Sequence, residues 1–507
     1  MRHIKDVNGQ ELGLEDRIDT IIWPITSANH SNTRRNPIPA SKREVAIENF
    51  SQKLDAKSYI YPIDDIGTTE RFAEYVLKKI EVESQGKFVL TPANTIVGCS
   101  TPSVIEQYER KGFRILPFEL EDRIRERYSA QRPWELVESI VQAGSGWRTS
   151  EDFLRKVSKA TRDLYLKYDY GDLIIELFSD PLLGDDGDIT ATRDYNTYVR
   201  SLDEGAKRKY ETIKPFMLPG RIVDIGCCTG SLIREMNLDD KMRESDFNGV
   251  EVARELFQIC EERKLHKYFH NDNVFFHQRN ITRGKIFPDN SINTTTTGSL
   301  TQEIESYQGM EALIGFVHKI YEQTALGGRW INVDVVGPED RNDVSYMLLC
   351  KEDGRNHDYQ RRFPKNERMQ FKEYLDGLST FARFLRFAMD FRHEEGYTLK
   401  YDLEKVQGNE YIRLRKVDAC EFMGKKDYTD NWDSEMHEKF CSLSFRDWAR
   451  ITLDAGFCIL PQSGSFQNQW IVANRFQGKV DLYKKESSSI VRIDYPPTNM
   501  LLVGEKR

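Results

Sequence analysis

The sequence lacks the features that place a chain in a membrane or in a disulfide framework. No stretch approaches the roughly 18 consecutive apolar residues of a membrane-spanning helix. The opening residues, MRHIKDVNGQELGLEDR, contain no apolar core of a secretion signal. Eight cysteines are present but no C-x-x-C pair, which disfavours a zinc site and a set of disulfides. We therefore expect a cytoplasmic protein with reduced thiols, without a metal and without a membrane partner.

A surplus of positive charge is missing too. The chain has 73 Lys and Arg residues against 81 Asp and Glu residues, a formal net charge of -8. Binding to nucleic acid needs a concentrated positive face, and no RNA-binding module with basic and aromatic residues stands out. The charge balance therefore favours a small-molecule or nucleotide-type substrate over RNA.

What the chain does contain is a short apolar run that ends in an acidic residue and breaks into a glycine turn, RIVDIGCCTGSL at 221–232. Gly226 and Gly230 allow a sharp turn and bring bare backbone close to a ligand. Their spacing is G-x-x-x-G, with Cys228 where G-x-G-x-x-G would have its middle glycine. The spacing disfavours a nicotinamide dinucleotide, because a pyrophosphate needs that close approach.

Further landmarks follow the turn in order. The second predicted strand ends at Glu251, about as far from Gly226 as the roughly 20 residues of a strand-helix-strand unit require. A carboxylate at this place can accept hydrogen bonds from both hydroxyls of a ribose. The third predicted strand ends at Asn280 and Ile281, and the fourth, SINTTTTGSL, is so polar that we expect part of TTTTGS, with Thr297, to form a loop of the active site.

Together these landmarks resemble the class I S-adenosylmethionine-dependent methyltransferases. The resemblance covers about 195–345 and extends to strands near the C-terminus. It implies S-adenosylmethionine as the cofactor, with Asp224 holding the ammonium of the methionine part. The cofactor-binding residues that the resemblance indicates are Asp224, Gly226, Cys228, Gly230, Glu251, Asn280, Ile281 and Thr297.

A chain of 507 residues is long enough for about two to four domains. We expect an α/β protein in which a Rossmann-like class I methyltransferase domain, 195–507, carries an inserted helical region at about 346–415. Alternating strand and helix patterns predict a smaller α/β domain with a parallel sheet at 1–120. Charged helical patterns at 121–194 predict a helical connector between the two.

The N-terminal domain has two polar loops after predicted strands, at 30–36 and 91–103. Adjacent arginines in the first loop offer planar donors to a phosphate chain. A histidine loop after the first strand and a Ser/Thr-rich helix start are similar to the nucleotidylyltransferase superfamily, although His30 is followed by Ser31 and Asn32 and does not match H-x-G-H. The similarity implies a nucleotide-binding-like domain, while a plain surface loop with a capping serine is the alternative.

Candidate catalytic bases follow the fourth and fifth predicted strands or lie farther along the chain, namely Glu303, Asp334 and His437. We prefer Glu303 together with Tyr307, because residues four apart share a helix face and this loop faces the transferred methyl group in the fold. The alternative is that Glu303 only stabilises the start of its helix. A dense polar set at 421–440 either lines a substrate pocket or lies on an exposed helix.

The sequence thus predicts a methyltransferase for a small-molecule or nucleotide-conjugated substrate, with a nucleotidylyltransferase-like domain as an option for a second activity. Two alternatives stay open. One is an RNA methyltransferase. The other is a scaffold that binds S-adenosylmethionine without catalysis.

Overall fold

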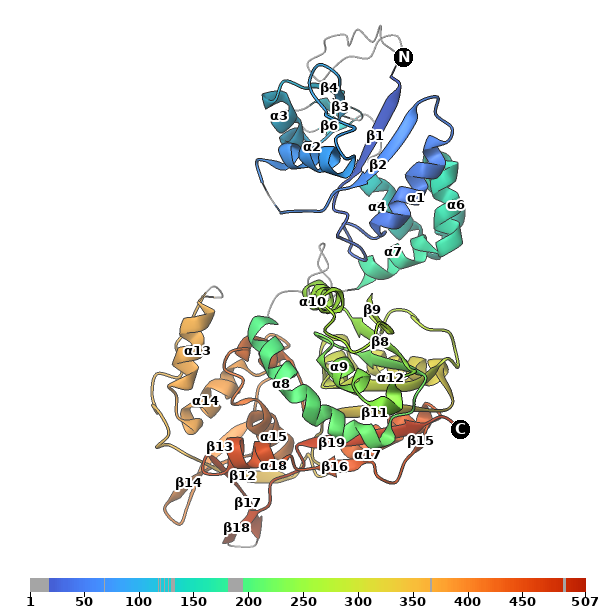
Figure 1. Cartoon of the computed structure of the whole chain (residues 1–507). Helices are drawn as coiled ribbons and strands as arrows, with labels where there is room; N and C mark the ends of the chain where they lie inside the picture. Colours follow the sequence, from blue (N-terminus) through green and yellow to red (C-terminus); the bar gives the residue numbers. More distant parts are fainter. Residues whose placement is uncertain are drawn as a thin grey trace. The chain divides into compact units, whose positions relative to one another are not determined.

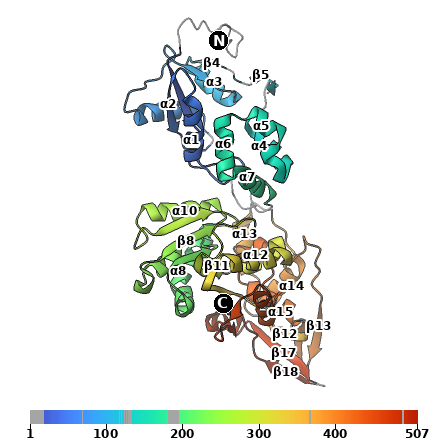
Figure 2. The ribbon, with the colours of Figure 1, turned by 90° about the vertical axis from the view of Figure 1, so that its right-hand side faces the viewer.

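A computed structural model shows the chain as alternating helices and strands (Figure 1, and turned by 90° in Figure 2). The residues that the structure describes are 18–67, 69–116, 118, 120–122, 124, 125, 127, 128, 133–180, 195–364, 367–486 and 489–507. Contacts divide the chain into unit 1 (Met1–Thr190) and unit 2 (Ala191–Arg507). The predicted boundary between residues 194 and 195 lies at the edge of a segment outside the described residues.

Unit 1 begins with two parallel strand pairs, β1 with β2 and β3 with β4. The stretch KFVLTPAN at 87–94 has an apolar run that favours a strand, but the structure has none there. Asn94 accepts a hydrogen bond from the Thr91 amide and donates one to the Val89 carbonyl, so a side chain takes the place of strand pairing. The elements of unit 1 are β1 (Thr20–Ile25), α1 (Ala40–Ser51), β2 (Lys57–Pro62), α2 (Phe72–Glu83), β3 (Ile96–Gly98), α3 (Pro102–Arg110), β4 (Arg114–Leu116), β5 (Leu120–Asp122), β6 (Arg127–Tyr128), α4 (Pro133–Ala143), η1 (Gly144–Thr149), α5 (Glu151–Lys156), α6 (Lys159–Tyr168) and α7 (Tyr170–Ser179).

Helices α4 to α7, which lie in the predicted connector, belong to unit 1. Trp147, Phe153 and Ile174 bury one another at the centre of these helices. Gly171 lies so close to the indole that an added Cβ would come within 2.2 Å of it. α6 also packs against α1, so the helices complete the core of unit 1.

Unit 2 is built around an eight-stranded sheet with the order β15-β19-β11-β10-β7-β8-β9 and with β16 beside β19. β7 to β11 are parallel, and β19 runs antiparallel between β11 and β15. The elements up to the fifth strand are α8 (Tyr195–Ile213), η2 (Lys214–Phe216), β7 (Arg221–Ile225), α9 (Ser231–Asn237), η3 (Asp240–Met242), β8 (Asp246–Glu251), α10 (Arg254–Leu265), β9 (Val274–Gln278), β10 (Ile292–Gly298), α11 (Thr301–Gln308), α12 (Met310–Gln323) and β11 (Thr324–Val335).

Helices cover both faces of this sheet. Apolar side chains of α11, α12 and α17 bury one face, and those of α8, α9 and α10 bury the other. Helices on both faces are typical of a largely parallel sheet. The predicted Rossmann-like α/β class is confirmed, and the sheet closes with α17 (Phe445–Asp454) and the antiparallel strand β19 (Asn499–Glu505).

The sequence suggested a helical insertion after β11, but the insertion also contains strands. Its helices pack on a second, antiparallel sheet with the order β13-β14-β12-β17-β18. Figures 1 and 2 show its two hairpins, β13 with β14 and β17 with β18, at the end of unit 2 far from α10. The remaining elements are β12 (Val344–Leu349), α13 (Arg368–Asp376), α14 (Thr380–Asp390), β13 (Tyr401–Val406), β14 (Asn409–Arg415), α15 (Lys416–Lys425), α16 (Trp432–His437), β15 (Cys458–Ile459), β16 (Gly464–Phe466), α18 (Gln469–Ile471), η4 (Val472–Phe476), β17 (Val480–Glu486) and β18 (Ser489–Ile493).

Candidate cofactor and catalytic site

The glycine turn between β7 and α9 has a backbone that favours glycine. Gly226 and Gly230 have φ angles of 71° and 74°, and Cys228 between them also has a positive φ, of 53°. A Cβ on Gly226 would lie 3.3 Å from the side chain of Leu300, and one on Gly230 would lie 3.1 Å from the ring of Phe276. The turn is therefore closely bordered by side chains at both of its glycines.

Two buried carboxylates flank this turn on the adjacent strands β7 and β8. Asp224 is 3% exposed and accepts a hydrogen bond of 2.8 Å from the Thr296 hydroxyl. Glu251 is 6% exposed and accepts 2.9 Å hydrogen bonds from the amides of Cys228 and Ala253. In the described part of the chain, no lysine or arginine nitrogen lies within 4.0 Å of either carboxylate.

Burial governs the protonation of both acids. It raises the pKa of Asp224 to about 6, against the weaker opposing effects of the Thr296 hydroxyl and the charge of Lys209. It raises the pKa of Glu251 to about 7, although backbone amides favour the ionised form. A ligand that brings a cation or hydroxyl donors would stabilise the ionised carboxylates and so lower their pKa values again. Such shifts mark candidate functional sites.

An ion pair fixes the second half of the turn. Asp203 of α8 accepts hydrogen bonds from the hydroxyls of Thr229, at 2.9 Å, and of Ser231. Arg263 of α10 binds the Asp203 carboxylate at 2.6 Å and donates to the Thr229 carbonyl at 3.0 Å. This pair could not be predicted from the sequence, because no local pattern links residues so far apart in the chain.

The third strand ends in a buried amide whose NH2 group has no acceptor among the described residues. Gln278 is 5% exposed, and within the described residues its Nε2 makes no hydrogen bond. It lies directly opposite Glu251 in the pairing of β8 with β9. The predicted Asn280 binds back to its own turn, accepting from the amide and hydroxyl of Thr282 at 3.0 and 2.8 Å, while Ile281 is buried in the core. Gln278 is a candidate that the sequence analysis did not name.

Thr297 lies inside β10 and not in a loop. Its hydroxyl donates to Asn332 at 2.9 Å and accepts from the Trp330 indole at 3.0 Å. β10 forms a strand because its neighbours β7 and β11 supply backbone pairing, and because Asp224 and Asn332 on these strands bind the hydroxyls of Thr296 and Thr297. The expected loop is therefore confined to the residues after Gly298, and the contact of Thr297 with a cofactor stays a prediction.

Asp334, a candidate base, is occupied by the start of α11. Its Oδ2 accepts from the Thr301 amide at 2.8 Å and from the Thr301 hydroxyl at 2.5 Å. Burial raises the pKa of Asp334 to about 6. A buried carboxylate bound at a helix N-terminus stabilises the helix, which leaves Glu303 as the candidate at this edge of the sheet.

Glu303 and Tyr307 lie on α11 as predicted. Burial raises the pKa of the Cys228 thiol, and the negative charges of Glu251 and Glu303 raise it further. Glu303 therefore lies close enough to the cofactor turn to influence the ionisation of this thiol. The Tyr307 hydroxyl lies 3.4 Å from the Ser434 hydroxyl and 3.4 Å from a Glu438 carboxylate oxygen.

His437 is directed elsewhere by the contacts of its ring. Its Nδ1 lies 2.6 Å from Glu395 and its Nε2 3.6 Å from Glu394. Although Ser434 and Glu438 on the same segment reach Tyr307, no described contact brings the imidazole to Glu303 or Tyr307. A catalytic role of His437 stays a prediction.

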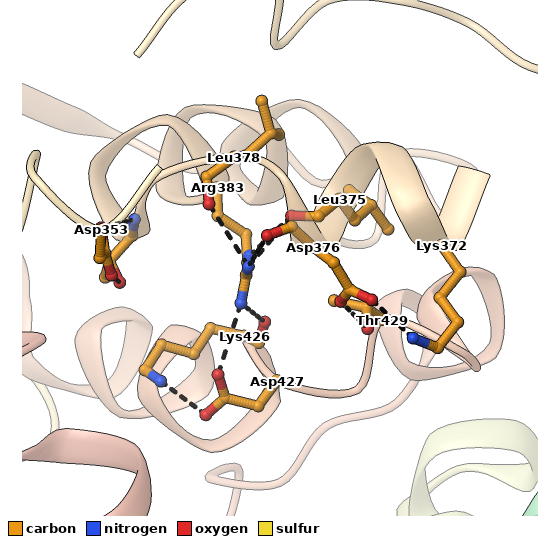
Figure 3. A network of polar contacts seen from close by, with 10 residues as sticks. Asp353, Lys372, Leu375, Asp376, Leu378, Arg383, Lys426, Asp427 and Thr429 are labelled. Carbon is orange, nitrogen blue, oxygen red and sulfur yellow. Dashed lines mark hydrogen bonds and ion pairs between the residues drawn. The ribbon is translucent and has the colours of Figure 1, made fainter. Parts of the chain in front are cut away.

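Part of the polar set at 421–440 is buried in ion pairs. Lys425 is fully buried and binds Glu421 at 2.9 Å, and Glu421 accepts from the Cys441 amide at 2.7 Å. Arg383 of α14 donates to the carbonyls that end α13 and to Asp427, which also binds Lys426 (Figure 3). Burial lowers the pKa of Lys426 to about 8. We call these residues the buried charge cluster, which comprises Arg383, Glu421, Lys425, Lys426 and Asp427.

In unit 1, Arg34, one of the two arginines predicted to bind phosphate, is hydrogen-bonded to backbone carbonyls. Arg34 donates to the carbonyls of Leu177 and Asp180 at the end of α7, at 3.2 and 2.5 Å. α3 begins at Pro102 within the predicted Ser/Thr-rich stretch. The roles of His30 and Arg35 of this loop in nucleotide binding stay predictions.

Unit 2 combines the strand order of its sheet, the left-handed glycine turn and a carboxylate at the end of each of the first two strands. Unit 2 has the fold of a class I S-adenosylmethionine-dependent methyltransferase. In the described residues no helix is long and apolar enough to cross a membrane.

Comparisons with known proteins separate the two parts of the chain. No family model matches. The N-terminal region is similar to the nicotinamide-nucleotide adenylyltransferase of Halorubrum lacusprofundi, 27% identical over 133 residues, 24% of this chain and 69% of the relative. The corresponding protein of Methanosarcina acetivorans is 25% identical over 134 residues, 26% of this chain and 68% of the relative. The predicted resemblance of this part to nucleotidylyltransferases is confirmed.

One solved structure aligned with the chain is an S-adenosylmethionine-dependent methyltransferase of Mesorhizobium loti, at 10% identity and a TM-score of 0.32. The alignment covers 60% of this chain and 100% of that one. The strand order, and not this alignment, defines the fold of unit 2.

Proposed function

We propose that unit 2 is an S-adenosylmethionine-dependent methyltransferase that acts on a small-molecule or nucleotide-type substrate. The observation that carries the proposal is the pair of buried carboxylates, Asp224 and Glu251, which flank a left-handed glycine turn without a lysine or arginine of the described residues in ion-pair contact. Buried acids of this kind need a ligand that supplies positive charge or hydroxyl donors.

The residues of the site fit the parts of the cofactor. Asp224 is placed to hold an ammonium group, and Glu251, which uses one lone pair of each oxygen, retains capacity for the two hydroxyls of a ribose. The Nε2 of Gln278, which has no acceptor among the described residues, is a donor for a ring nitrogen of adenine. Bound S-adenosylmethionine supplies an electrophilic methyl group on its sulfonium.

Residues of α11 bind and activate the methyl acceptor in this proposal. Methyl transfer requires that the acceptor atom be held in line and, where it carries a proton, that a base remove it. Glu303 is the base that we propose, and Tyr307 orients the acceptor through its hydroxyl. The segment Ser434–Glu438 closes this side of the site by its contacts to Tyr307.

Calorimetry of the full chain with S-adenosylhomocysteine, followed by transfer of a radiolabelled methyl group into fractionated cell extract, tests the proposal. We expect binding, and label in the small-molecule fraction. Glu303→Gln should lower turnover by about 100-fold or more and leave the Kd for the cofactor unchanged. Failure to bind S-adenosylhomocysteine would contradict the proposal. Label in RNA would establish the RNA methyltransferase, and binding without transfer into any fraction would establish the scaffold.

A second activity is favoured by the similarity of the N-terminal region to nicotinamide-nucleotide adenylyltransferases. We propose that unit 1 binds a nucleotide and transfers a nucleotidyl group, with His30 and Arg35 at the phosphates. The test is release of pyrophosphate from ATP in the presence of nicotinamide mononucleotide, with His30→Ala as the variant. Tight ATP binding without pyrophosphate release would limit unit 1 to binding.

A further inference from the structure

The helix α8 is fastened to the cofactor side of unit 2 at two places. Near its middle, Asp203 binds the glycine turn and Arg263. Near its end, the buried Tyr210 donates a 2.5 Å hydrogen bond to Asp239 beyond α9. Residues between the two anchors are thus held at fixed positions relative to the turn, and Lys209 is one of them.

The ammonium of Lys209 lies beside the end of β10, next to the cofactor turn. It is 4.0 Å from the place that a Cβ on Gly298 would take, where β10 ends beside the first residues of the turn. Its charge acts on both Asp224 and the Cys228 thiol, where it opposes the larger effect of burial. Yet within the described residues no carboxylate lies within 4.0 Å of this ammonium, although Lys214 of the next turn is paired with Asp239 at 3.0 Å.

An α-amino acid carries its ammonium and its carboxylate on one carbon atom. A site that holds the ammonium at Asp224 must therefore receive the carboxylate within a few ångströms, and a carboxylate in a half-buried site needs a cation or several donors. Gly298 has no side chain that would fill the space next to Lys209. A lysine and an aspartate that are close but not paired fit the two charges of one zwitterion.

We propose that Lys209 binds the carboxylate of the amino-acid part of the cofactor. The inference rests on the proposed function and adds a specificity to it. Asp224 and Lys209 together select ligands with an intact amino-acid tail over adenine nucleosides that lack one. α8 is thereby a part of the binding site as well as a cover of the sheet.

Two ligands separate this role from a general effect on the site. S-adenosylhomocysteine has the amino-acid tail, and 5'-methylthioadenosine has the same nucleoside and thioether without it. Calorimetry is carried out with both ligands on the full-length wild type, on Lys209→Met and on Lys207→Met, which changes an exposed lysine of the same helix. Lys209→Arg keeps the charge.

We expect Lys209→Met to weaken S-adenosylhomocysteine binding by about 10- to 100-fold, the value of a hydrogen bond to a charged group, with no change for 5'-methylthioadenosine. Lys207→Met should change neither Kd, and Lys209→Arg should restore most of the affinity. Equal losses for both ligands, or no loss for S-adenosylhomocysteine, would overturn the inference. If the wild type binds neither ligand, the proposed function fails as well, so the two failures are distinguishable. Unchanged melting temperatures verify that the variants fold.

Discussion

Two of the regions in which unit 2 buries charged side chains differ in how the charges are paired, namely the cofactor edge with Asp224 and Glu251 and the buried charge cluster. In the cluster each charge has an opposite partner, as in the 2.9 Å pair of Lys425 and Glu421. At the cofactor edge the described hydrogen bonds to the two acids come from neutral donors, and burial raises the pKa of both. Paired charges hold elements together, whereas buried acids that are not in an ion pair are candidates for binding a ligand.

The largest effect is expected where the cluster loses one partner. Lys425→Met leaves Glu421 buried without its cation and should lower the free energy of unfolding by about 3 to 5 kcal/mol. Affinity of the folded protein for S-adenosylhomocysteine should not change. Chemical unfolding gives the stability and calorimetry the affinity. Lys485→Met, which breaks the exposed pair with Glu404, is the matched control and should cost less than about 1 kcal/mol. Comparable losses in both variants would erase the distinction between the regions.

The opposite pattern is expected for Asp224→Asn. This change should weaken S-adenosylhomocysteine by about 10- to 100-fold. It should not lower stability at about pH 8, because an acid whose pKa is raised by burial gains nothing from its charge in the folded protein. Calorimetry and thermal unfolding measure the two quantities, with the exposed Asp246→Asn as the control. A destabilised but tightly binding variant would place Asp224 with the structural charges.

The pH dependence of stability sharpens the comparison further. The pKa of Glu251 is about 7 in the folded protein against an ordinary value of 4.5, so the folded state holds a proton that the unfolded state releases. Its contribution to the free energy of unfolding is present below about pH 4.5 and is lost as the pH rises through about 7. Melting temperatures measured from about pH 5 to about pH 8 should fall less for Glu251→Gln than for the wild type. The exposed Glu244→Gln should retain the wild-type slope.

The smallest effect is expected for the hydroxyl that supports Asp224. Thr296→Val removes a 2.8 Å hydrogen bond to the carboxylate and keeps the shape of the side chain. A net value of about 1 kcal/mol predicts an about fivefold weaker Kd for S-adenosylhomocysteine near pH 7. The loss of affinity should be smaller at higher pH, where Asp224 is ionised even without the hydrogen bond from Thr296. A pH-independent loss would point to packing.

The sequence predicted the cofactor edge better than the rest of unit 2 for a physical reason. Buried parallel strands read as local apolar runs, and the glycine turn is fixed by its own residues, so β7, Gly226 and Glu251 are visible within short stretches. The same holds for α11 with Glu303 and Tyr307. Contacts that join distant segments, such as Asp203 with Arg263, leave no local pattern.

The second sheet was missed because its pairing is long-range. β12 pairs with β14 and with β17, which follows more than a hundred residues later, and the strands β13 and β14 alternate charged and apolar residues around a turn. Likewise, Thr294–Thr297 looks too polar for a strand when read alone. The hydroxyls of Thr296 and Thr297 find their buried partners, Asp224 and Asn332, on neighbouring strands.

The position of β19 has a consequence for how unit 2 forms during synthesis. β19 lies between β11 and β15, and its Glu505 pairs with Arg329, 176 residues earlier in the chain. Until residues 499–505 leave the ribosome, β11 presents an open edge with unpaired amides and carbonyls, and β15 has no strand to join. Such a late, distant pairing slows folding and exposes a growing chain to association with its neighbours. A nascent chain that stalls before residue 499 is therefore expected to engage chaperones at the β11 edge.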